Sequence, residues 1–180
     1  SATATTGNIT QSGALAITGV TTIAADSGNN ITLDNTSNNF QAAVRITSGN
    51  NVTLVDAGAI DLGASTVSGT YAVTATAVGD ITDSGVLAIT GTSTFTVAGG
   101  QSIILDLDNT FSAAVAFNTS GGVLLDVEIN DSTAFELPTL TVTRDLTVTA
   151  GDDITDDGTV TVGRNLAATT NANNGVITLN

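Results

Sequence analysis

The chain of 180 residues contains no cysteine, histidine, methionine, tryptophan or lysine. It can therefore form no disulfide bond and offers a metal no thiolate or imidazole ligand. The same absences exclude Ser-His-Asp and Cys-His nucleophilic sites, Schiff-base chemistry and a Walker-type phosphate loop. We expect no enzyme activity. A hydrolase that uses carboxylates alone is the catalytic alternative, and Glu128 and Glu136 are the only glutamates available to it.

Positive charge is scarce as well. Three arginines, Arg45, Arg144 and Arg164, stand against 17 acidic residues, and the formal net charge is -14. Such a chain repels nucleic acid and anionic lipid, so we expect no nucleic acid partner. The arginines are far apart in the sequence, which argues against a phosphate-binding patch. No apolar run approaches the roughly 18 to 20 residues of a spanning helix, so we expect no membrane insertion.

What the chain does contain is organised by a long repeat. The segment GNITQSGALAITG at Gly7 returns as GDITDSGVLAITG at Gly79, and more loosely as GDDITDDGTVTVG at Gly151, with a spacing of about 72 residues each time. We expect one continuous segment of a longer array over 1–180, because the chain opens and closes in mid-repeat. The expected long repeats are 7–78, 79–150 and, in part, 151–180.

A shorter repeat lies inside the long repeat. GNIT at Gly7, GNNIT at Gly28 and GNNVT at Gly49 follow one another at intervals of about 21 residues. Apolar residues alternate with polar ones, and Gly, Asn, Asp and Ser interrupt the alternation every few residues, which predicts short strands. About three strands fill one such interval, the size of one rung of a β-solenoid whose rungs stack about 4.8 Å apart.

The predicted fold class is therefore all-β, a parallel β-helix (β-solenoid) with about 21 residues per rung and about eight rungs. A string of immunoglobulin-like sandwiches is the alternative. The short repeat argues against sandwiches. So do the lack of tryptophan and the single tyrosine, Tyr71, because such sandwiches usually have a large buried aromatic residue and a tyrosine corner. In a solenoid Leu33 is expected to lie against Leu54, one rung away.

The recurring phrase SGNN predicts a recurring corner. Glycine at Gly28 and Gly49 would supply a positive φ, and the amides of Asn30 and Asn51 would form a ladder between rungs. Acidic residues close several strands, and if they stack, two pairs of like charges would lie about 5 Å apart, a repulsion that exposure to water tolerates without a metal ion. These pairs are Asp34 with Asp56 and Asp106 with Asp126.

Acidic turns supply the metal-binding candidates. GDDITDDG gathers four aspartates in one short turn, and clustered carboxylates suit Ca²⁺. Solvated turns are the alternative interpretation, and we expect no other cofactor. The candidate Ca²⁺ ligands are Asp152, Asp153, Asp156 and Asp157.

Threonine-rich segments resemble the threonine arrays of ice-binding solenoids. They are TSTFT at 92–96 and TVT at 141–143, 147–149 and 159–161. Ice binding requires one flat face with the motif on every rung, whereas these segments have irregular spacing. Threonines on exposed strand faces are therefore the favoured interpretation.

The repeats GNITQSGALAITG, SGNNITL and TRDLTVTAGDDIT resemble the Thr/Asn/Gly-rich solenoid repeats of filamentous-haemagglutinin-like two-partner-secretion exoproteins and of autotransporter passengers. The resemblance covers the whole chain. It implies a right-handed parallel β-helix, export across a bacterial outer membrane, and a fibre that carries adhesive tips away from the cell.

The resemblance leads us to expect a noncatalytic structural shaft of a bacterial surface adhesin or extracellular fibre. Its location would be the cell surface or the extracellular space. Its partners would be neighbouring repeats of the same protein and a host or cell-surface ligand that the sequence does not identify. A self-polymerising filament subunit, joined end to end, is the alternative, and an ice-binding solenoid is a weaker one.

Overall fold

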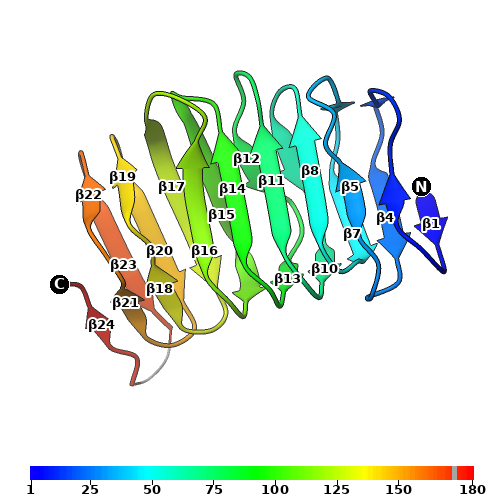
Figure 1. Ribbon diagram of the computed structural model, residues 1–180. Coiled ribbons are helices and arrows are strands. Elements are labelled where there is room, and N and C mark those ends of the chain that lie inside the picture. Colours follow the sequence, from blue (N-terminus) through cyan, green and yellow to red (C-terminus); the bar gives the residue numbers. More distant parts are fainter. Residues whose placement is uncertain (172–173) are drawn as a thin grey trace.

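A computed structural model describes residues 1–171 and 174–180. The backbone winds into a parallel β-solenoid of about eight turns, which confirms the predicted fold class. Figure 1 shows the turns stacked side by side from the blue N-terminal end to the red C-terminal end. The described part of the chain holds no helix with the length and apolar character needed to span a bilayer.

Each turn places strands on three sides of the tube, which we name face 1, face 2 and face 3. Face 1 holds β1 (Ala2–Ala4), β4 (Thr21–Ala25), β7 (Val44–Ser48), β10 (Ser65–Val67), β13 (Leu87–Ile89), the C-terminal end of β15 (Gln101–Phe111), β18 (Phe135–Leu137), β21 (Ile154–Asp156) and β24 (Ile177–Thr178). Face 2 holds β2 (Ile9–Thr10), β5 (Ile31–Leu33), β8 (Val52–Asp56), β11 (Tyr71–Ala75), β14 (Ser93–Val97), β16 (Val115–Thr119), β19 (Leu140–Val142) and β22 (Val160–Val162). Face 3 holds β3 (Ala16–Ile17), β6 (Asn39–Phe40), β9 (Ile60–Leu62), β12 (Ile81–Asp83), the N-terminal part of β15, β17 (Leu124–Asp131), β20 (Leu146–Ala150) and β23 (Leu166–Thr170).

Residues one turn apart pair along each face. On face 2 Leu33 pairs with Leu54, which confirms the expected stacking of successive rungs. The offset between paired residues varies, because Val44 pairs with Leu62 across a short turn and Ile103 pairs with Val127 across a longer one. The interval of about 21 residues is therefore an average turn length. Short and long turns differ in the length of their corner segments.

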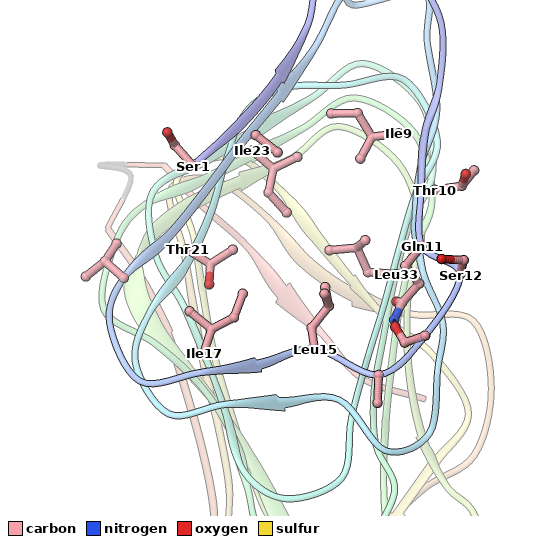
Figure 2. A pocket seen from close by; sticks show the side chains of 14 residues that line it. Ser1, Ile9, Thr10, Gln11, Ser12, Leu15, Ile17, Thr21, Ile23 and Leu33 are labelled. Carbon is pink, nitrogen blue, oxygen red and sulfur yellow. Dashed lines mark hydrogen bonds between the residues drawn. The ribbon is translucent and has the colours of Figure 1, made fainter.

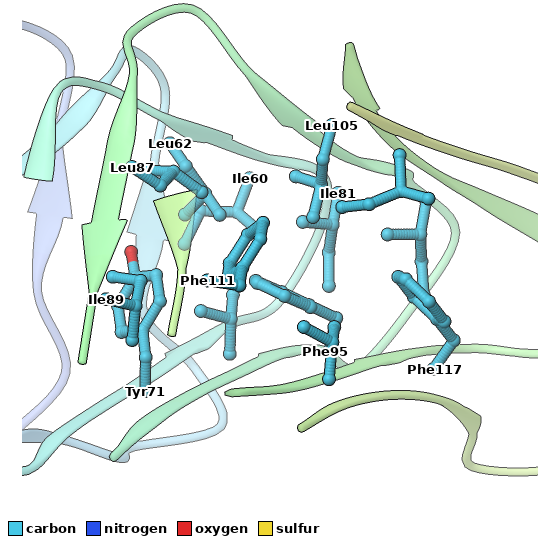
Figure 3. Close-up of a cluster of buried hydrophobic side chains, with 14 of the residues drawn as sticks. Ile60, Leu62, Tyr71, Ile81, Leu87, Ile89, Phe95, Leu105, Phe111 and Phe117 are labelled. Atoms are coloured by element: carbon cyan, nitrogen blue, oxygen red, sulfur yellow. The ribbon is translucent and has the colours of Figure 1, made fainter. Parts of the chain in front are cut away.

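Inward-facing side chains from all three faces fill the tube. Alternation places Ile31 and Leu33 inside and leaves Thr32 between them part-exposed, as a half-buried strand requires. Part of the core is aromatic. The ring of Phe95 lies 6.1 Å from that of Tyr71, 6.0 Å from that of Phe111 and 6.4 Å from that of Phe117. Figure 3 shows these rings packed among isoleucine and leucine side chains.

The glycines of the SGNN corners do not have the predicted conformation. Neither Gly28 nor Gly49 has a positive φ, so that expectation is wrong. At Gly49 the reason for glycine is space, because an added Cβ would lie 2.9 Å from Cδ1 of Ile31 on the rung below. At Gly28 an added Cβ would meet nothing within 4 Å, and the structure gives no reason for glycine there. Positive φ occurs at other corners, for example at Gly100 (81°).

The long repeat does not return to the same face. Ile9 of the first copy lies on face 2, Ile81 of the second on face 3, and Ile154 of the third on face 1. Successive copies are ten strand positions apart when β15 is counted on both of its faces, which is three full turns and one further side. Each copy is therefore rotated by one side of the tube and displaced along the rod by about 16 Å.

Candidate functional site

Side-chain oxygens at the corners bind the backbone of the next rung. Asn8 Oδ1 accepts a hydrogen bond from the Asn30 N–H at 2.8 Å, Asn30 Oδ1 accepts one from the Asn51 N–H at 3.1 Å, and Asn51 Oδ1 accepts one from the Thr70 N–H at 3.0 Å. The expected contact between Asn30 and Asn51 is thus confirmed. It joins a side chain to a backbone amide, however, and not two side-chain amides.

The same bond recurs in each copy of the long repeat. Asp80 and Asp153 occupy the position that Asn8 has in the first copy, directly before the isoleucine of GNIT, GDIT and GDDIT. Asp80 Oδ1 accepts the N–H of Ser102 and Asp153 Oδ1 accepts the N–H of Val176, both at 2.7 Å. Each bond satisfies an amide at a corner, where the strand ladder is interrupted.

Three residues after Asp80 and after Asp153, a second aspartate accepts a backbone amide. Asp83 Oδ1 accepts the N–H of Asp106 at 3.1 Å, and Asp156 Oδ1 accepts the N–H of Asn180 at 3.0 Å. Both residues hold the position of Gln11 in the first copy. The polar positions of the repeat therefore bind consecutive turns to one another.

These bonds assign a role to two of the four candidate calcium ligands. Asp153 and Asp156 accept backbone amides of the next turn, and Asp152 and Asp157 are exposed. Over residues 1–171 and 174–180, no group of three or more acidic side chains lies close enough to hold a metal ion. Calcium binding by the four aspartates stays a prediction.

A buried asparagine forms hydrogen bonds inside the tube at the corner after Leu105. Asn109 is fully buried, and its Oδ1 accepts the N–H of Leu87 at 2.8 Å. Its Nδ2 donates to Asp83 Oδ2 at 2.7 Å and to the Leu105 carbonyl at 3.4 Å. All the polar atoms of this side chain are therefore bonded inside the tube.

Asn38 forms the same arrangement in the preceding copy of the long repeat. It is also fully buried, and its Oδ1 accepts the N–H of Leu15 at 2.9 Å. Its Nδ2 donates to Gln11 Oε1 at 2.9 Å and to the Leu33 carbonyl at 3.3 Å. The long repeat thus builds one corner twice, on different sides of the tube.

Burial raises the pKa of three carboxyl groups. The pKa of Asp83 is raised to about 6, mainly by burial, which the hydrogen bond from Asn109 opposes and the charge of Asp106 reinforces. Burial also raises the pKa of Glu128, with a contribution from the charge of Asp106. It raises the pKa of Asp131 too, against hydrogen bonds from Thr133.

The chain should consequently become more stable as the pH falls toward 5. The folded-state pKa of Asp83 lies above its ordinary value of 3.8, so protonation favours the folded state, and this contribution is lost as the pH rises through about 6. We expect the free energy of unfolding to be about 1 kcal/mol higher at pH 5 than at pH 7.5, a figure reduced for the partial exposure of the group. Urea titrations at the two pH values measure this difference.

The matched variants are Asp83→Asn, which keeps an acceptor for the Asn109 amide, and Asp34→Asn, which changes an exposed carboxylate. The first should reduce the pH dependence, leaving the part that Glu128 and Asp131 contribute, and the second should leave it unchanged. A wild-type protein that loses stability between pH 7.5 and pH 5 would contradict the assignment.

The aspartates that close neighbouring strands do not stack on one another. Asp56 is buried, where its Oδ2 accepts the N–H of Phe40 and its Oδ1 that of Gly58, both at 2.7 Å. It therefore caps backbone amides inside a corner, while Asp34 is exposed. Neither pair stacks, because turns of unequal length move each aspartate out of line with the other.

The second expected pair is separated in the same way. Asp126 bonds with Ser102 of the rung below and forms an ion pair of 3.1 Å with Arg144, whereas the carbonyl of Asp106 accepts a bond from Asn130.

Two of the arginines lie together, contrary to their separation in the sequence. The N–H of Arg164 donates to the carbonyl of Arg144 on the neighbouring rung at 2.9 Å. Each guanidinium is paired with an aspartate one rung back, Arg144 with Asp126 and Arg164 with Asp145. These pairs are part-exposed and contribute little to stability, but they offset the two positive charges locally.

Three of the four threonine segments lie on face 2, where Thr141 pairs with Thr161. They are 92–96, 141–143 and 159–161, and TVT at 147–149 lies along face 3. On face 2 the outward column of threonines is interrupted by alanine, at Ala72 and Ala116. Glu128 lies in β17 and Glu136 in β18, on faces 3 and 1.

Both ends of the tube present apolar side chains. At the N-terminal end Ile9, Leu15 and Ile17 surround a hollow of about 570 Å³, and Figure 2 shows these side chains pointing toward the axis. At the other end Leu166 is 45% exposed and Ile177 is 42% exposed. The end turns also have strands with a neighbour on one side only, such as β1 and β24. Stacking of a further turn would cover these groups.

A parallel tube whose turns are joined by backbone ladders and by repeated corner acceptors defines the class of β-solenoid repeat proteins. Within that class, a family model described as repeats of unknown function (DUF5649) matches residues 1–47, 49–118 and 125–180. The chain belongs to this family of repeats. No curated protein and no solved structure matches it.

Proposed function

We propose that this solenoid is a noncatalytic structural shaft of a large secreted bacterial surface adhesin or extracellular fibre. One observation supports the proposal above the others: the turns stack without interruption from β1 to β24, and polar side chains at the corners bond each turn to the next. Such a tube resists bending, and its length scales with the number of turns. Mechanical reach is what a shaft has to supply.

Surface labelling of intact producing cells tests the location. Antibodies raised against the segment should bind intact cells. A second experiment tests the rod: an in-frame deletion of one long repeat should shorten it by about 16 Å, as measured by scattering or electron microscopy. Labelling that appears only after lysis would contradict the proposal. So would binding of the isolated segment to host cells or glycans, because the segment would then be a recognition module.

A self-polymerising subunit is the alternative. The apolar hollow around Ile9 and Leu15 and the exposed Leu166 and Ile177 are the surfaces that an end-to-end contact would bury. Sedimentation at high protein concentration separates the two functions. A persistent monomer supports the shaft, and fibres that grow with concentration support polymerisation.

A further inference from the structure

The backbone ladder of face 2 stops before the end of the tube, whereas that of face 3 continues through β15, β17 and β20. On face 2 one sheet runs from β2 to β16 and ends there, although β19 and β22 follow on the same face. β19 belongs to a different sheet, in which its Val142 pairs with Leu124 of β17. Counting back from this pair places Thr139 opposite Gly121, beyond the end of β16. One edge of β16 is therefore left without a paired strand.

This open edge of β16 presents backbone groups. The other edge pairs with β14, and there the N–H of Ser120 donates to the carbonyl of Val97 at 2.9 Å. Bonding directions alternate along a parallel strand, so the even-numbered residues face β14 and the odd-numbered ones face the open edge. Within residues 1–171 and 174–180, the N–H groups of Phe117 and Thr119 have no hydrogen-bond acceptor. An added strand would supply one.

The preceding copy of the long repeat closes the equivalent edge. Its strand β7 follows NNFQAAV as β16 follows NTFSAAV. The next turn covers β7, because the N–H of Gly63 donates to the carbonyl of Val44 at 2.9 Å and Ser65 Oγ accepts the N–H of Ile46 at 3.1 Å. Phe117 holds the position of Ile46 in the later copy. The edge is thus covered in one copy and open in the other.

A groove of about 350 Å³ lies along the open edge. Its apolar surface comes from the buried Phe117 and Leu140 and from Val123, which is 45% exposed. Its lining includes no charged side chain, although the chain has 17 acidic residues. The groove therefore suits a neutral occupant that carries both backbone polar groups and apolar side chains.

We propose that this groove binds an extended, uncharged peptide segment of another protein, which adds a strand to the edge of β16. The backbone of the segment would bond to Phe117 and Thr119, and alternate side chains would pack against Val123 and Leu140. The bound strand would continue the ladder that β14 already forms on the other edge. A second folded copy is too thick to enter between two turns, and its own end strands, such as β1 and β24, lie at the ends of its tube.

Titration of the isotope-labelled protein with a capped peptide of the β14 sequence, STFTV, tests the site by amide NMR. The amides of Phe117 and Thr119 should shift and gain protection from hydrogen exchange. Those of Ala116 and Asn118 already face β14 and should keep the protection they have. The same peptide with alternate amides N-methylated should bind at least about tenfold more weakly, because it lacks the donors of a strand.

A pair of exposed valines provides matched variants. Val123→Asp should weaken binding about tenfold, since it places a charge against the apolar part of the bound strand. Val78→Asp is the control, because Val78 is 84% exposed at another corner and does not line the groove. It should leave the affinity unchanged.

Three results would overturn the proposal. The first is the absence of saturable shifts with the STFTV peptide, and the second is equal binding of the N-methylated peptide, which would exclude strand addition. The third is a concentration-dependent dimer that the peptide dissociates, because a second copy of the chain would then be the occupant. The shaft proposal does not depend on this titration.

Discussion

Replacing Phe95 by alanine is expected to lower the free energy of unfolding by about 4 kcal/mol. Phe95 is fully buried and contacts three other rings, those of Tyr71, Phe111 and Phe117. Its strand pairs with β11 on one side and β16 on the other, so backbone hydrogen bonds hold the neighbouring turns at a fixed spacing. The tube cannot collapse into the space the ring leaves, and the cavity persists.

Urea unfolding measures this loss, and hydrogen exchange locates it. Protection should fall in β11, β14 and β16 more than in β4, because each turn of a solenoid contacts only its neighbours. Thr94→Ala is the matched control, since Thr94 is the outward neighbour of Phe95, and it should change stability by less than about 0.5 kcal/mol. A loss below about 1 kcal/mol for Phe95→Ala would show that the aromatic cluster does not form.

Replacing Asn109 by alanine is expected to cost about 3 kcal/mol. The variant leaves the Leu87 amide without its acceptor and removes the amide donor that contacts Asp83. A buried amide without a partner costs more than the net value of the bond that it lost. Unfolding titrations of the variant against the wild type measure the effect.

The long repeat supplies an internal check of this prediction. Asn38→Ala should cost a similar amount, because Asn38 makes the equivalent bonds to Leu15 and Gln11. Asn118→Ala is the control at an exposed position of face 2, and it should be nearly neutral. If Asn109→Ala were as stable as Asn118→Ala, the buried corner would have no role in holding the turns together.

Much of the fold could be predicted from the sequence because alternation and repetition are local signals. Ile31 and Leu33 alternate with polar residues, the same pattern recurs one turn later at Val52 and Leu54, and the two segments do stack in pairs. The length of each turn could not be read in this way. It is set at the corners, and it differs between the turn from Val44 to Leu62 and the turn from Ile103 to Val127.

The sequence also contains the information that successive copies of the long repeat lie on different faces. A spacing of about 72 residues is not a whole number of turns of about 21 residues, so the copies at Gly7 and Gly79 could not lie on one face. This rotation gives each side of the tube a different copy of the same corner.

The bonds of the polar corner residues could be predicted only in part. Asn30 contacts Asn51 as expected, whereas Asp56 turns inward and caps the amide of Phe40. Nothing in the sequence distinguishes an aspartate that turns inward from one that faces solvent.

The most direct test of the stacked tube is a distance between spin labels at Thr10 and Ala116. Both lie on face 2, and register pairs connect them through Thr32, Thr53, Ala72 and Thr94 in five steps. The chain has no cysteine, so two introduced cysteines can be labelled without background. Pulsed electron spin resonance should give a single narrow distribution at about 24 Å between the backbone positions, widened only by the label linkers. A broad distribution, or a distance that does not grow by about 4.8 Å per turn when the second label moves from Thr94 to Ala116, would contradict the stacked tube.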